Sequence, residues 1–203
     1  MAAAASCTGA WADARAGLRY TFHTSAVRAL AAGFFLAGLS ACDDVALPFL
    51  ARDLGAGERA IGALYAAVGA GLIAGYVLLA RRRTATKAGA GLVLGAAVAG
   101  AGNALTGMAP AVALAVAFQI VRGAGLAVYE TFLQTTLQRE VPGELLGRVV
   151  ANAYGAVNVG ACVGLLAAGP LLDTTSARVV LIASGGMGLL SAWVSSRAGR
   201  MSA

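Results

Sequence analysis

Residues 88–121 read AGAGLVLGAAVAGAGNALTGMAPAVALAVAFQIV and contain no charged side chain. One continuous helix over this stretch would be about 50 Å long, whereas the hydrocarbon core of a bilayer is about 30 Å thick. Asn103, Gly107 and Pro110 lie near the middle of the stretch, where Gly and Pro favour a break. The stretch therefore predicts two membrane-spanning helices joined by a short turn.

Further long uncharged runs lie on both sides of this stretch. They cover residues 60–80, 149–172 and 179–196. Because a membrane-spanning helix needs about 20 apolar residues, we expect an all-α polytopic membrane protein with six spans. The expected spans are Ser25–Leu50, Ile61–Ala80, Gly89–Gly107, Pro110–Gln138, Leu146–Leu172 and Val179–Ser196.

The composition of the whole chain agrees with a membrane protein. Of its 203 residues, 59% are hydrophobic and 12% are charged, and the mean hydropathy is +0.78. An average soluble domain is about 25% charged, and disordered chains combine low hydrophobicity with high charge, so both classes are excluded. We expect a cytoplasmic segment over 1–24, a six-helix bundle over 25–198 and a cytoplasmic tail over 199–203. In the first segment, residues 9–22 fit either an interfacial helix or a plain polar tail.

The distribution of Lys and Arg predicts the orientation, since these residues gather on the cytoplasmic side. With the N-terminus inside, eleven basic residues lie inside, and only Arg52, Arg59 and Arg178 lie outside. Arg122 lies within a span. We therefore expect a multi-pass protein of the plasma membrane with both termini in the cytoplasm. The same bias explains the net charge of +6 without a nucleic-acid partner.

Four charged residues fall inside the expected spans and are candidates for a substrate or proton pathway. Asp43 and Asp44 lie in the outer half of the first span, Arg122 lies near the middle of the fourth, and Glu130 lies two turns further along. A charge at the bilayer centre costs at least about 2.5–3.5 kcal/mol, so such residues normally face protein or a water-filled cavity. Asp43 and Arg122 lie about 13 Å and 18 Å from the outer ends of their spans, depths that allow an ion pair.

Each candidate also has a structural alternative. Adjacent helical residues point about 100° apart, so the two aspartates cannot both face Arg122, and one could simply be solvated. Arg122 fits a structural salt bridge as well as a functional one. Glu130 fits either a cavity carboxylate, which can bind and release a proton, or the inner end of a polar seam with Gln134 and Gln138.

Several motifs resemble those of the major facilitator superfamily of transporters. The segment LQREVPGELLGRV over 137–149 resembles the cytoplasmic loop that precedes the next-to-last span of exporters in this family. Residues 164–178 are similar to a Gly-x-Leu-x-Asp-x-x-Gly-x-Arg signature, with Ser176 where Gly is expected. The run Arg-Gly-Ala-Gly over 122–125 is similar to the start of a cavity-lining helix, and residues 47–55 fit the end of the seventh span.

The resemblance covers roughly residues 11–197 and is to the C-terminal half, spans seven to twelve, of a drug or metabolite exporter. It implies half of a major facilitator bundle, built from two inverted three-helix repeats, that belongs to a proton-coupled exporter. The mostly small, apolar side chains with few charges suit small amphiphilic molecules as substrates. The first and fourth spans would then line the cavity. The loop over 75–87 lacks the Asp of the family's inner signature. The residues implied in conformational gating are Arg81, Arg82, Arg83, Gly147, Arg148, Gly169, Asp173 and Arg178.

The resemblance leaves the N-terminal six-span half of such transporters without a counterpart. We therefore expect this chain to act together with an N-terminal half or with a second copy of itself, in contact with lipid and a small-molecule substrate. A six-span accessory or permease subunit and a non-functional truncated remnant are the alternatives. We do not expect an enzyme, a metal or a cofactor, because the one histidine, His23, lies outside the spans and the three cysteines are scattered.

Overall fold

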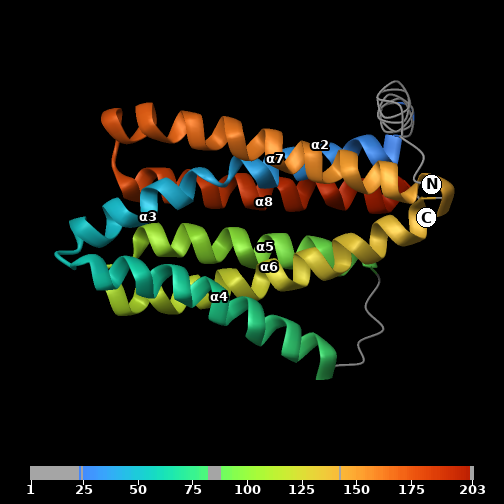
Figure 1. Ribbon diagram of the computed structural model, residues 1–203. Helices are drawn as coiled ribbons and strands as arrows, with labels where there is room; N and C mark the ends of the chain where they lie inside the picture. Colours follow the sequence, from blue (N-terminus) through green and yellow to red (C-terminus); the bar gives the residue numbers. More distant parts are fainter. Residues whose placement is uncertain (1–22, 24, 82–87, 142, 202–203) are drawn as a thin grey trace, which may run out of the picture.

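The computed structural model describes residues 23, 25–81, 88–141 and 143–201. Nearly all of the expected N-terminal segment, together with Arg82 and Arg83, lies outside the described residues. The described secondary structure is helical, which confirms the predicted all-α class (Figure 1). The helices are α2 (Ser25–Leu39), α3 (Cys42–Asp53), α4 (Glu58–Arg81), α5 (Ala88–Met108), α6 (Val112–Glu140), α7 (Gly143–Thr174) and α8 (Ala177–Met201).

Six segments of the described chain are long and apolar enough to cross a membrane, as predicted. The first of them, Ala31–Asp53, combines α2 and α3 and is therefore not one continuous helix. It is interrupted at Ser40 and Ala41, where the Ser40 hydroxyl donates to the Ala37 carbonyl at 2.6 Å. Backbone bonds here reach back only three residues, as from Asp43 to Ser40 at 3.2 Å, which tightens the turn.

A proline within α3 leaves a backbone carbonyl without its usual partner. Pro48 has no N–H, so it cannot donate to the carbonyl of Asp44 four residues earlier. The hydroxyl of Tyr65 on α4 donates to that carbonyl instead. α3 ends just before Gly55, whose φ of 68° is the left-handed conformation common after a helix.

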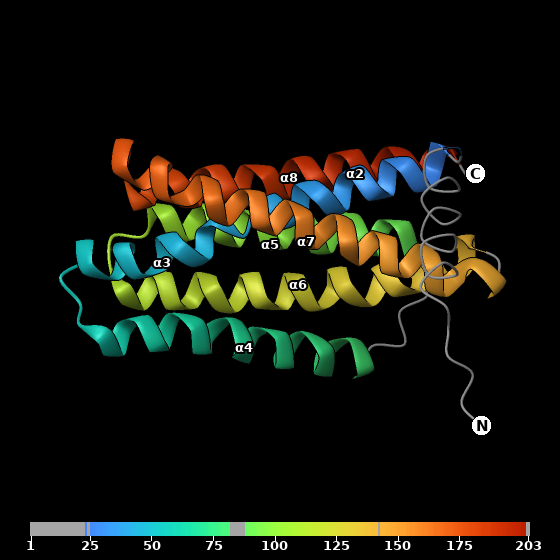
Figure 2. The same cartoon turned by 45° about the horizontal axis from the view of Figure 1, so that its top comes forward.

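The packing order of the helices is symmetric. α4 packs on α6, α6 on α5, α5 on α8, α8 on α2, and α2 on α7 (Figures 1 and 2). If the unit α2–α3, α4, α5 is exchanged with α6, α7, α8, the set of contacts is unchanged, and the central α5–α8 contact maps onto itself. The α4–α6 contact, for example, becomes the α7–α2 contact. This is the arrangement expected for half of a major facilitator bundle made of two three-helix repeats.

Glycines allow close backbone approach at symmetry-related interfaces. A Cβ on Gly71 of α4 would overlap the Ile120 carbonyl of α6, and a Cβ on Gly38 of α2 would overlap the Val157 carbonyl of α7. Apolar surfaces gain no hydrophobic stabilisation by pairing in lipid, so close van der Waals packing has to hold the helices together.

The buried side chains form two apolar clusters with a polar layer between them. One cluster is built around Phe34, Leu92 and Leu133, and the other around Leu47 and Leu181. Along α5, α6 and α8, the positions between these clusters are occupied by buried polar residues. They are Asn103, Thr106, Gln119 and Ser184.

Candidate transport site

Asp43 forms the centre of the polar layer. Its side chain is 0% exposed at the start of α3, directly after the break in the first span, and it forms an ion pair with Arg122 of α6. The structure therefore brings together the two residues whose depths in the membrane allowed an ion pair. Of the two adjacent aspartates, Asp43 faces Arg122, whereas Asp44 is exposed.

Neutral polar side chains extend the ion pair into a network. Asn103 of α5 donates to Asp43 Oδ2 at 3.0 Å and to the Ser184 hydroxyl of α8 at 2.6 Å. Arg122 donates to Gln119 Oε1 at 3.2 Å. The amide of Gln119 in turn lies 3.2 Å from the Thr106 hydroxyl and 3.5 Å from Asn103 Oδ1. The network thus joins four helices through side chains alone.

One atom of the network has no hydrogen-bond partner. Asp43 Oδ1 is buried and accepts no bond from any side chain or backbone group that the structure describes. Asp43 Oδ2, in contrast, accepts from both Arg122 and Asn103. Because a buried oxygen without a donor is costly, Oδ1 is the least satisfied position of the network.

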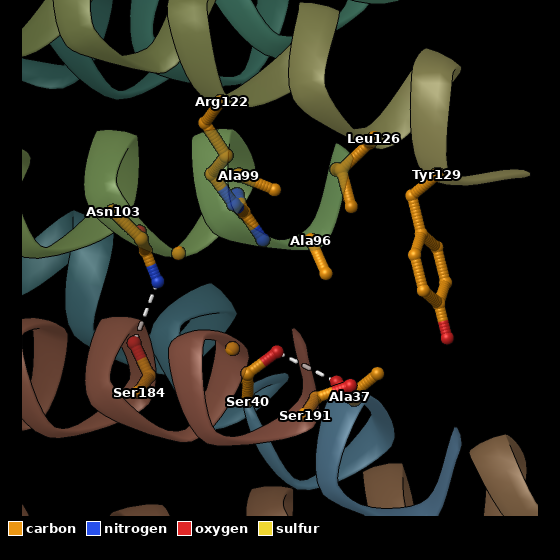
Figure 3. Close-up of a pocket in the computed structure, with 12 residues that line it drawn as sticks. Ala37, Ser40, Ala96, Ala99, Asn103, Arg122, Leu126, Tyr129, Ser184 and Ser191 are labelled. Atoms are coloured by element: carbon orange, nitrogen blue, oxygen red, sulfur yellow. Dashed lines mark hydrogen bonds between the residues drawn. The ribbon is translucent and has the colours of Figure 1, made fainter. Parts of the chain in front are cut away.

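A pocket adjoins this network between α2, α5, α6 and α8 (Figure 3). In Figure 3, Arg122 and Tyr129 enter from α6, and Ser40 of the turn after α2 and two serines of α8 lie on the opposite side. Its polar lining residues are Ser40, Asn103, Arg122, Tyr129, Ser184 and Ser191. The ion pair thus lies beside a cavity with both hydroxyl groups and apolar walls.

Glu130 does not belong to the buried network. It is exposed on α6, and the hydroxyl of Tyr76 on α4 donates to its Oε2 at 2.5 Å. One helical turn further, Gln134 donates to the Tyr154 hydroxyl of α7 at 3.3 Å. The four charged candidates therefore divide into an ion pair between buried Asp43 and partly buried Arg122, and two exposed carboxylates.

The residues implied in gating lie near the ends of the helices. Arg178 donates to the carbonyls of Gly107 and Ala109 at 3.3 and 3.0 Å, and so binds the C-terminal end of α5. No ion pair joins Arg178 to Asp173 in the structure as described. The other described members of the set are exposed at helix ends or on α7: Arg81, Gly147, Arg148, Gly169 and Asp173.

The network includes residues that the sequence analysis did not select. Asn103 was interpreted as part of a break, but α5 continues past it to Met108, and the turn lies at residues 109–111. Gln119, Thr106 and Ser184 were not singled out. The sequence contained a signal for Asn103 and Gln119, because each is an uncharged amide in the middle of an apolar span. A buried amide needs hydrogen-bond partners, so such a residue is expected to contact other polar groups.

Comparison with known proteins identifies a family. The family model described as transmembrane secretion effector, within the major facilitator superfamily, matches residues 8–201. Comparisons with curated proteins and with solved structures gave no match.

Proposed function

This chain belongs to the transmembrane secretion effector family of major facilitator transporters, and we propose that it forms one six-helix unit of a proton-coupled exporter of small amphiphilic molecules. Membership in the family implies transmembrane transport rather than an enzymatic reaction. Within such a transporter, the six spans correspond to the C-terminal half. The observation that carries the proposal is the buried ion pair between Asp43 and Arg122.

The ion pair supports coupling of proton binding to a conformational change, because neutralising one of its two charges leaves the other without a partner. Together Asp43 and Arg122 are neutral, but a proton on Asp43 leaves the Arg122 guanidinium, which is only 13% exposed, without a counter-charge. An uncompensated buried charge costs about 3–5 kcal/mol. Proton binding therefore changes the relative free energies of the conformations that bury or expose Arg122, which is the requirement for coupling a proton to a rearrangement.

Exposed polar groups support a second six-helix unit as the partner. Asp44 on α3, Tyr65 on α4, Glu130 on α6 and Tyr154 on α7 are all exposed inside candidate spans. Carboxylates facing lipid are unfavourable, and alternating access works by rocking one bundle against another around a site between them. We propose that an N-terminal half or a second copy covers these groups. A monomer of this chain that moves substrate in proteoliposomes at limiting dilution would contradict that arrangement.

Transport by reconstituted protein tests the coupling. Proteoliposomes would carry the wild-type chain, with a second unit if one is required, and would be supplied with cationic, neutral and anionic amphiphilic dyes. An imposed pH gradient should accelerate movement of at least one dye. The Asp43→Asn variant should lose the effect of the gradient, whereas Asp53→Asn, at the exposed end of α3, should keep it. An unchanged gradient dependence in Asp43→Asn would exclude Asp43 as the coupling residue.

The charge distribution supports an orientation and a location. We propose that the chain lies in the plasma membrane with both termini in the cytoplasm, because basic residues of the sequence gather at one set of loops. The loop between α3 and α4 then lies outside the cell.

A further inference from the structure

A second polar cluster lies on the exposed side of the bundle. α6 carries Glu130 and Gln134 one helical turn apart, α4 contributes Tyr76 and α7 contributes Tyr154. At this end of the molecule, α6 lies between α4 and α7 (Figures 1 and 2). Two aromatic rings therefore flank a carboxylate and a carboxamide. We call these four residues the Tyr–Glu cluster.

The cluster places a carboxyl group at membrane depth. The hydrogen-bond partner of Glu130 is the neutral phenol of Tyr76, and no basic side chain among those described forms an ion pair with Glu130. Glu130 lies nine residues, or about 13 Å along the helix, from Arg139. Arg122 does not compensate it, because Arg122 is already paired with Asp43. A cation bound beside Glu130 would supply an opposite charge that the described side chains do not.

The aromatic rings of the cluster have accessible surfaces. Tyr76 is 43% exposed and Tyr154 is 42% exposed. The face of an aromatic ring attracts cations, and quaternary cations in particular are bound by sets of aromatic rings. Gln134 adds a carbonyl that can accept a hydrogen bond from a protonated amine.

We infer that the Tyr–Glu cluster binds the charged group of a lipophilic organic cation. Glu130 supplies the opposite charge, and Tyr76 and Tyr154 supply ring faces beside it. The inference rests on the proposed function, since it names the substrate class that an exporter with this unit recognises. The inference assigns different roles to the two carboxylates. Asp43, paired with Arg122, binds the proton, and Glu130, which has no basic partner among the described residues, binds the cationic group of the substrate.

Equilibrium binding of tetraphenylphosphonium to the purified full chain in mild detergent tests this inference. Tetraphenylborate has nearly the same shape and the opposite charge, so it controls for hydrophobic partition, and protein-free micelles supply the blank. The wild-type chain should bind the phosphonium saturably and should not bind the borate. Glu130→Gln, which keeps the shape of the side chain, should lower phosphonium affinity at least tenfold.

Matched variants distinguish charge and ring effects from a loss of folding. Glu58→Gln removes a carboxylate at the start of α4, outside the cluster, and should leave the affinity within about twofold. Tyr76→Phe keeps the ring and should bind better than Tyr76→Leu, which removes it. All variants should give the same elution profile and a thermal unfolding midpoint close to that of the wild type.

Three results would overturn the inference. They are no saturable binding of the phosphonium, equal binding of the borate, or full phosphonium affinity in a folded Glu130→Gln variant. Because this measurement uses neither a pH gradient nor transport, its failure is distinct from failure of the proposed function. A chain that exports neutral or anionic dyes with Asp43-dependent coupling but binds no phosphonium would retain the function and lose the cation site.

Discussion

Asn103 on α5 donates a hydrogen bond to the carboxylate of Asp43 on α3 at 3.0 Å, although 60 residues separate the two in sequence. The same amide nitrogen donates to Ser184 of α8 at 2.6 Å. Asp43 therefore has a neutral donor as well as the charged donor Arg122. The ion pair is one part of a polar layer that ties together helices from both three-helix repeats.

The first prediction concerns Asn103 itself. Replacement by Leu removes the donor to Asp43 and leaves Ser184 and Gln119 with one partner fewer, so the bundle should lose about 1–3 kcal/mol of stability. Asn158→Leu makes the same chemical change at an exposed position of α7 and should have little effect. Thermal unfolding in detergent measures both. Equal midpoints for the two variants would show that the Asn103 bonds contribute nothing.

The second prediction is that Asp43 and Arg122 depend on each other energetically. Asp43→Asn leaves a buried guanidinium and Arg122→Gln leaves a buried carboxylate, so each single change should cost about 3–5 kcal/mol. The double variant should be more stable than the sum of the two losses implies, because it leaves neither charge unpaired. Unfolding measurements on the four proteins complete the cycle. Additive losses would mean that the ion pair has no net interaction energy.

The third prediction contrasts two glycines of α4. A Cβ at Gly71 would overlap the backbone of Ile120, whereas a Cβ at Gly69 has nothing within 4 Å. Gly71→Ala should therefore push α4 away from α6 and cost about 1–3 kcal/mol. Gly69→Ala should be neutral or stabilise the helix by up to about 1 kcal/mol. The two unfolding midpoints provide the comparison, and a stable Gly71→Ala protein would contradict the close packing of α4 and α6.

The fourth prediction concerns orientation. Gly57 is exposed in the loop between α3 and α4, which we place outside the cell. In a background without the three native cysteines, a membrane-impermeant thiol reagent applied to intact cells should label Gly57→Cys. It should label Ser202→Cys only after the cells are opened. The reverse pattern would show that the chain is inserted the other way round.

The number of spans was predictable from the sequence. Residues 60–80, 88–121, 149–172 and 179–196 are uncharged, and in lipid such a chain has to form helices because only a helix satisfies its backbone hydrogen bonds within one segment. This requirement applies to each uncharged run separately and does not depend on how the helices pack. The split of residues 88–121 was predicted because one helix of that length would exceed the bilayer core, and because Asn103, Gly107 and Pro110 favour a break.

The hydrogen-bond partners of the polar residues inside the bundle were not predictable in the same way. Asn103 was interpreted as a breaker because Asn favours turns, but in α5 its amide finds Asp43 and Ser184 on other helices. Those bonds offset the preference of Asn for turns, and they exist only after the helices pack. The interruption at Ser40 was likewise missed, since Ser is tolerated within helices.

The sequence by itself determined that six apolar spans cross the membrane and that charged residues lie within the first and fourth of them. Only the tertiary structure decided that Asp43, and not Asp44, faces Arg122. Adjacent residues point about 100° apart on a helix, so either aspartate could have faced inward until the phase of α3 was known. The turn at Ser40 and Ala41 and the packing of α3 against α8 and α7 set that phase. They bury one carboxylate in the network and leave the other exposed.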